Sequence, residues 1–119
     1  MLPRTPGFNE IPEETARIAR AAFPKGNLYM QLHDAVGPIY DNQQFAALFS
    51  NLGQPAEDPA RLALTTIMQF AEGLSDRQAA DAVRGRIDWK YALALELTDS
   101  GFDASVLSEF RNRLIAGSS

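Results

Sequence analysis

The chain has 119 residues, the size of one domain, and its 45% hydrophobic content is enough for a single core. It has no cysteine, which excludes disulfides, thiolate zinc sites and cysteine nucleophiles. The net charge of −4 is unlike that of most nucleic-acid-binding domains, in which a basic excess provides affinity for phosphate.

The first ten residues contain two prolines, a glycine and an asparagine, and we expect them to form a flexible arm. Residues 11–116 are expected to form one helical domain. No apolar run follows a basic start at the N-terminus, and the longest apolar stretch, around 62–71, is shorter than the ~20 residues of a membrane span. We therefore expect a cytoplasmic protein.

Two helices are predicted before residue 40, because each has a start signal and a stop signal. The first begins at Pro12, which suits a first helical turn, and ends before Pro24. The second begins after the N-cap residue Asn27 and ends at Gly37-Pro38. Its apolar face is expected to contain Leu28, Leu32 and Val36.

A third helix is predicted from Asp41, which with Gln44 resembles a capping box. Its apolar residues are Phe45, Leu48, Phe49 and Leu52, and a loop is expected at 53–55. A fourth helix begins at Asp58-Pro59, a cap followed by proline at the first helical position, and ends at Gly73. Its apolar spacing is given by Leu62, Ile67, Phe70 and Ala71.

Ser75 and Gln78 form a second capping box, which predicts a helix from residue 76 to about residue 84 that Gly85 ends. Asp88 is expected to cap a short helix through Trp89, Leu93 and Leu95. Asp103 or Ser105 caps the last helix, on which Val106, Phe110 and Leu114 lie on one face. No segment shows sustained period-2 alternation, so the predicted fold is an all-α bundle of about six short helices without a sheet.

Nothing in the sequence indicates a catalytic centre. His33 is the one histidine, and with Asp34 beside it we expect a surface or half-buried residue rather than a general base. A zinc site would need a second nitrogen or sulfur ligand. Most acids stand at helix starts, where capping explains them, and no glycine-rich phosphate loop is present. The chain is therefore expected to be non-catalytic by itself and to bind no cofactor.

Residues 73–97 have the layout of a helix-turn-helix: a capped short helix, a glycine-containing turn and a second short helix. Ala79 and Ala80 are small enough to let the two helices cross closely. In known examples the second helix lies in the major groove and the first crosses the backbone. The candidate DNA-contacting residues are Arg77, Gln78, Arg84, Arg86, Lys90 and Tyr91.

A purely structural reading of the same residues stays open. Short capped helices joined by glycine turns are common in helical domains, and Trp89 is better explained as a core residue than as a platform for a base. On the last helix, Arg111 and Arg113 alternate with other polar residues, which favours a solvated helix face over a DNA contact.

Several ordered runs of residues carry a family resemblance. They are Leu62-Ala63-Leu64 through Gln69-Phe70, Glu72-Gly73-Leu74-Ser75-Asp76-Arg77-Gln78-Ala79-Ala80, Arg86-Ile87-Asp88-Trp89-Lys90-Tyr91-Ala92-Leu93, and Phe102-Asp103 with Ser105-Val106-Leu107-Ser108-Glu109-Phe110-Arg111-Asn112-Arg113-Leu114. Upstream, residues 11–15, 23–27 and 53–56 also match. Together they resemble the N-terminal domain of bacterial DDE-type insertion-sequence transposases.

In that family the domain precedes a ribonuclease-H-like core, whose three acids bind the divalent metal, expected to be magnesium, for strand cleavage and joining. None of those acids can be placed in this sequence. The resemblance implies a domain that recognises transposon ends on double-stranded DNA and positions the catalytic core, with no membrane or small-molecule partner. The alternative is a protein–protein module that forms homodimers without touching DNA, and a folded remnant without activity is a third reading.

Overall fold

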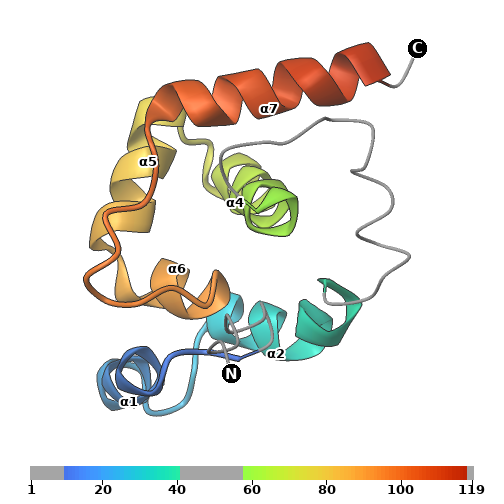
Figure 1. Ribbon diagram of the computed structural model, residues 1–119. Coiled ribbons are helices and arrows are strands. Elements are labelled where there is room, and N and C mark those ends of the chain that lie inside the picture. The colour runs from blue at the N-terminus through green and yellow to red at the C-terminus, as the bar shows by residue number, and fades with distance from the viewer. Residues whose placement is uncertain (1–9, 41–57, 118–119) are drawn as a thin grey trace, which may run out of the picture.

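The computed structural model of the protein describes residues 10–40 and 58–117, and these residues form helices and connecting loops without a strand. The predicted all-α class is confirmed. The helices, labelled as in Figure 1, are α1 (Glu13–Ala22), α2 (Leu28–Tyr40), α4 (Pro59–Glu72), α5 (Asp76–Gly85), α6 (Ile87–Ala92) and α7 (Ala104–Gly117). No helix among the described residues is long and apolar enough to cross a membrane.

The short helix α6 joins the two parts of the bundle. It packs against α1 and α2 on one side and against α5 on the other, while α4, α5 and α7 pack together. Figure 1 shows α7 along one end of the molecule and α1 at the opposite end. The main core contains the completely buried side chains of Trp89, Leu64, Met68 and Leu107.

Several predicted caps and one predicted helix end are confirmed. The Asp58 carboxylate accepts a hydrogen bond from the backbone N–H of Ala60 at 2.8 Å, and Gly73 ends α4 in the left-handed conformation, with φ of 67°. Ser75 and Gln78 form the expected capping box at the start of α5. Before α7, the Asp103 carboxylate accepts from the backbone N–H of Ser105 at 3.0 Å, so Asp103 is the cap of the two candidates.

Two expectations about α2 are wrong. Asn27 does cap it, accepting from the backbone N–H of Met30 at 3.0 Å, but the helix continues through Gly37-Pro38 to Tyr40. A proline inside a helix removes one backbone hydrogen bond, and here that loss does not end the helix. Leu28, expected on the apolar face, is 68% exposed, whereas Leu32 packs against the core as expected. The buried positions of α2 are Tyr29, Met30 and His33.

The apolar face predicted for α4 is right at Leu62, which is 1% exposed, and wrong at its other positions. Ile67 and Phe70 are 53% and 71% exposed, whereas Leu64 and Met68 are completely buried. Because α4 carries apolar residues around most of its circumference, spacing alone does not select the inward face. The prediction that Asp88 caps the short helix now labelled α6 is wrong. The N-cap of α6 is Arg86, and Asp88 lies in the first turn of the helix.

Three predictions lie outside the described residues. These are the arm, except for Glu10, the helix predicted from Asp41 to Leu52, and the loop at 53–55.

Candidate nucleic-acid interface

Of the two helices in the predicted helix-turn-helix, α5 is the one with exposed arginine side chains. Its inner face holds Ala79 and Val83, both with no exposed surface. Arg77 and Arg84 are both exposed on this helix, two turns apart. The Arg84 side chain donates a long hydrogen bond, 3.4 Å from Nε, to the carbonyl oxygen of Ser100.

The second helix of the unit, α6, has no face available for a DNA groove. All of its residues from 88 to 92 are buried, and only Ile87 is partly exposed. A single residue, Arg86, separates it from α5. The helix-turn-helix interpretation is therefore not confirmed, because a recognition helix needs exposed side chains that reach base edges.

Lys90 and Tyr91, two of the predicted contact residues, are enclosed in the bundle. Lys90 is 3% exposed and its ammonium group donates to the carbonyl oxygen of Asp99 at 2.5 Å; burial lowers the pKa of this lysine. Tyr91 is 2% exposed, and its hydroxyl donates to the Asp34 carboxylate at 3.0 Å. Burial, with this hydrogen bond, raises the pKa of Tyr91. The polar groups of the Lys90 and Tyr91 side chains are therefore bound by other residues of the chain.

Arg86, a third predicted contact residue, lies at the centre of a polar cluster between α2, α4 and α6. Its Nη1 is 2.8 Å from both carboxylate oxygens of Glu72, and its Nη2 is 2.9 Å from Asp88. The guanidinium carbon is 5.7 Å from the ring centre of Tyr29 and 5.3 Å from that of Trp89, within cation–π range. Arg86 therefore holds three elements together.

Glu72, which the sequence did not single out, collects most of the donors of this cluster. Besides Arg86, it accepts from the hydroxyl of Tyr29 at 2.5 Å and from the indole N–H of Trp89 at 3.4 Å. Hydrogen bonds from Arg86 and then Tyr29 lower the pKa of the Glu72 carboxyl. Burial, together with the bond to this carboxylate, raises the pKa of Tyr29 to about 12.

Gln78, the remaining uncharged candidate, caps the N-terminus of α5 together with Ser75. Its side-chain oxygen accepts from the backbone N–H of Ser75 at 2.9 Å, while its own backbone N–H donates to the Ser75 hydroxyl at 3.1 Å. A contact from Gln78 to a base edge would compete with this capping box. Of the six predicted contact residues, Arg77, Gln78 and Arg84 are exposed on α5, and Arg77 and Arg84 are the cations among them. DNA contact by any of the six stays a prediction.

Arg111 was expected on a solvated face, and it instead fastens α7 to α5. Its two terminal nitrogens are 2.5 and 2.8 Å from the Asp76 carboxylate oxygens. Hydrogen bonds from Arg111 lower the pKa of Asp76. Arg113 forms an ion pair with Glu109 on its own helix, at 2.6 Å. The Arg111–Asp76 pair joins residues 35 positions apart, so local sequence patterns do not predict it.

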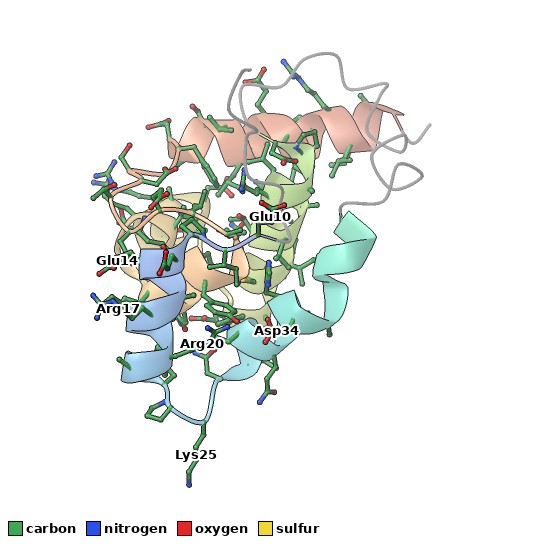
Figure 2. The ribbon with its side chains drawn as sticks, turned by 60° about the horizontal axis from the view of Figure 1, so that its bottom comes forward. Glu10, Glu14, Arg17, Arg20, Lys25 and Asp34 are labelled. Carbon is green, nitrogen blue, oxygen red and sulfur yellow. The ribbon has the colours of Figure 1, made fainter. Side chains whose placement is uncertain are left out.

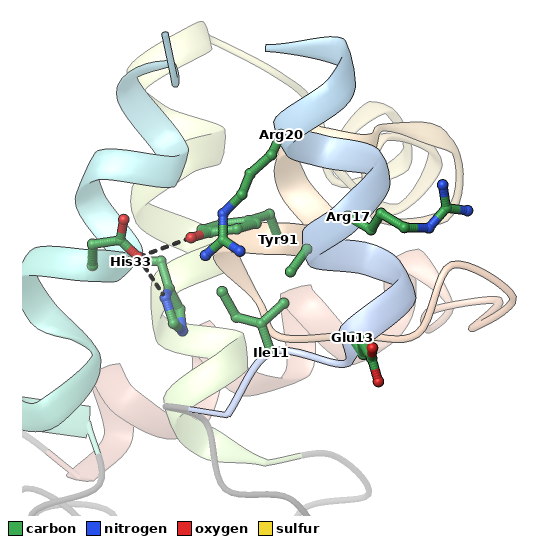
Figure 3. A pocket seen from close by; sticks show the side chains of 8 residues that line it. Ile11, Glu13, Arg17, Arg20, His33 and Tyr91 are labelled. Carbon is green, nitrogen blue, oxygen red and sulfur yellow. Dashed lines mark hydrogen bonds and ion pairs between the residues drawn. The ribbon is translucent and has the colours of Figure 1, made fainter. Parts of the chain in front are cut away.

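A second surface feature is an open pocket of about 780 Å³ between α1 and α2 (Figure 3). Buried His33 and Tyr91 contribute to its lining, with the guanidinium of Arg20 6.0 Å from the centre of the Tyr91 ring. His33 is 2% exposed, more deeply buried than expected, and its Nδ1 is 3.6 Å from the Asp34 carboxylate.

The charges around this pocket are mixed. Figure 2 shows Glu14, Arg17 and Arg20 along α1, with Lys25 at the turn that follows. Arg17 forms an ion pair with Glu14, so this face has no uniform sign of charge that would select an anion. Within the described ranges, no group of three or more His, Cys, Asp or Glu residues is arranged to hold a metal ion.

The sequence matches one family model, described as "Transposase domain (DUF772)", over residues 17–113. This chain belongs to that transposase domain family. The match spans α1 to α7, from Arg17 to Arg113, and so includes the α5 surface and the Arg86 cluster. No curated protein and no solved structure matches the sequence.

Membership of the transposase domain family confirms the relationship that the sequence motifs indicated, at the level of a transposase-related domain. The cation positions predicted within the matched region divide into two kinds. Arg77 and Arg84 face outward, whereas the half-exposed Arg86 and the buried Lys90 are bound by other residues of the chain.

Proposed function

We propose that this transposase domain is the DNA-handling part of a DDE-type transposase, which binds transposon ends and positions a ribonuclease-H-like catalytic core on them. The observation that carries the proposal is the outward face of α5. It bears Arg77 and Arg84 on a helix whose opposite face is fixed in the core of a domain from a transposase family.

The α5 face suits contact with the DNA backbone. The two arginines are separated by two helical turns, about 10 Å along the axis, so they reach different phosphates. Guanidinium groups bind phosphate oxygens with paired hydrogen bonds. Asp81 is exposed on the same helix between them and reduces the local positive potential. The expected contribution of this face is therefore positioning by a few phosphate contacts rather than tight binding.

Binding by this face is expected to depend moderately on salt. Each phosphate contact contributes about −0.9 to the slope of log K against log salt concentration. Two contacts predict a loss of affinity of about tenfold for a fourfold rise in salt. Discrimination between sequences requires base contacts beyond these two arginines.

The experiment is a fluorescence-anisotropy titration of the chain against labelled terminal repeats of its own element, with scrambled DNA of equal length as control, at two salt concentrations. Tighter binding to the repeats, weakened by salt, supports end recognition. Equal affinity for both DNAs removes end recognition from the domain, and the absence of binding at both salt concentrations overturns the proposal.

A second candidate is a pairing module that brings two transposase copies together without contacting DNA. It is favoured by the net charge of −4 and by the exposed, uncharged side chains on α4. The two roles are compatible in one domain, since they use different helices.

A further inference from the structure

The outermost line of α5 carries charges of alternating sign. The helix buries Ala79 and Val83 completely. Three exposed residues, Arg77, Asp81 and Arg84, lie on the opposite side of the helix. They follow one another at intervals of four and three residues, the spacing that keeps side chains on one stripe of a helix. A single carboxylate therefore lies between two guanidinium groups on the face proposed to contact DNA.

The position of Asp81 suits an ion pair, yet its carboxylate forms none with the two arginines. Residues three or four positions apart are neighbours on a helix surface, where opposite charges can bind one another. Arg84 instead donates from Nε to the carbonyl oxygen of Ser100, at 3.4 Å. Among the residues that the structure describes, none provides a hydrogen-bond or ion-pair partner for the Asp81 side chain. Its oxygens therefore keep their capacity to accept hydrogen bonds from a ligand.

The fold gives Asp81 no structural role of the kind that it gives to nearby acids. The carboxylate of Asp76 binds Arg111, and that of Glu72 binds Arg86. Asp81 lies in the interior of α5, away from both caps, where aspartate is one of the less favourable residues for a helix. Its side chain therefore stabilises neither the helix nor the packing of its neighbours.

The dimensions of α5 suit the major groove of DNA. A helix with its side chains is about 10–12 Å across, and the groove is about 12 Å wide. Arg77 and Arg84 are about 10 Å apart along the axis, so in a helix that lies across the groove each can reach the phosphates of one strand. Asp81 lies between them and has the shorter side chain, which places it over the base edges.

A carboxylate over the base edges favours one base. Its oxygens only accept hydrogen bonds, and the donors in the major groove are the amino groups of cytosine and adenine. Adenine presents the acceptor N7 beside its amino group, and N7 repels a carboxylate, whereas cytosine presents its amino group alone. Phosphates repel the carboxylate as well, so a duplex without cytosine at this point is bound less tightly.

We propose that Asp81 is a specificity-determining residue, which accepts a hydrogen bond from the N4 amino group of a cytosine in the terminal repeat. The inference rests on the proposed function, because Arg77 and Arg84 have to bring α5 to the DNA. It supplies a base contact that two phosphate-binding arginines lack. Loss of one such contact is expected to lower the affinity about tenfold.

The test measures the affinity of the full chain, by fluorescence anisotropy, for the terminal repeat and for repeats in which one C·G pair at a time is changed to T·A. This change replaces the amino donor of cytosine by the O4 acceptor of thymine. Wild type should lose about tenfold in affinity at one pair of the series. Asp81→Ala should bind that changed repeat and the original equally, while it keeps its losses at other pairs.

Glu13→Ala is the matched control, because it removes the same charge from an exposed acid on α1 and should retain the tenfold loss. Asp81→Ala should fold like wild type, since position 81 is exposed and alanine favours a helix. Circular dichroism of both variants checks their folding.

The proposal is overturned if no C·G pair matters to wild type, or if Asp81→Ala keeps every loss that wild type shows. A gain in affinity of Asp81→Ala for the original and changed repeats alike also overturns it, because charge alone would then explain the effect of the residue. In these cases wild type still binds the repeats, so the proposed function stands. A wild type that binds no repeat overturns the proposed function and this inference together.

Discussion

Arg86 shows how one side chain can be mistaken for a DNA contact. The sequence places it in a locally basic run next to Gly85, yet its guanidinium is bound by Glu72 and Asp88 and lies near two aromatic rings. The two carboxylates are 14 and 2 positions away in sequence, and the former pairing depends on how α4 packs. A long-range partner of this kind is not visible in the order of residues.

Removing Arg86 should destabilise the fold rather than only weaken DNA binding. Arg86→Ala leaves the partly buried carboxylates of Glu72 and Asp88 without their main donor, and we expect a loss of about 2 kcal/mol in the free energy of unfolding. Urea denaturation measures this change. Arg17→Ala, which removes an exposed ion pair with Glu14, is the control and should have little effect. Equal losses in both variants would contradict the structural role of Arg86.

The lowered pKa of Glu72 makes part of the stability depend on pH. Because the folded-state pKa lies below the ordinary value of about 4.3, the stabilisation is complete above that value and is lost as the pH falls through the lowered pKa. Glu72→Gln should therefore be less stable than wild type near neutral pH, and the difference should shrink on acidification below about pH 4. Urea denaturation of both proteins near neutral pH and below about pH 4 tests this. The same difference in unfolding free energy at both pH values would contradict the prediction.

At the scale of the element, the sequence correctly predicts several helix boundaries that depend on a few neighbouring residues. The caps at Asp58 and Ser75 and the left-handed Gly73 depend on backbone groups within four residues. The inward face of α4 and the burial of α6 were not predicted, because both depend on which helices pack together. Pro38 was predicted as a stop, but α2 continues two residues beyond it, to Tyr40.

The capping box of α5 gives a direct test of this local control. Ser75→Ala removes the acceptor for the Gln78 N–H and should cost about 1 kcal/mol of unfolding free energy. Ser75→Ala should also weaken the proposed DNA binding by α5, because the first turn of the helix would fray. Ser100→Ala, at an exposed serine of the loop before α7, is the control and should leave stability unchanged. Thermal denaturation of the two variants compares them, and equal melting temperatures would show that the box contributes nothing.

At the scale of the whole molecule, charge and apolar surface are divided between different helices. The exposed arginines of α5 and the exposed, uncharged side chains of α4 belong to one packed unit that also includes α7. A net charge of −4 opposes general attraction to DNA, so contact is expected to be local to α5. Pairing of two copies, the second candidate function, would place two α5 surfaces in one assembly and raise their combined affinity for paired ends by increasing the effective concentration.

The most direct test of DNA handling by α5 compares two double charge reversals in a titration with terminal-repeat DNA. Arg77→Glu with Arg84→Glu changes α5, and Arg17→Glu with Lys25→Glu makes the same change in net charge at α1 and the turn after it. The account predicts at least a tenfold loss of affinity for the α5 variant, with a reduced salt dependence, and a much smaller loss for the control. Equal losses in the two variants would show only a general charge effect and would contradict the assignment of the interface to α5.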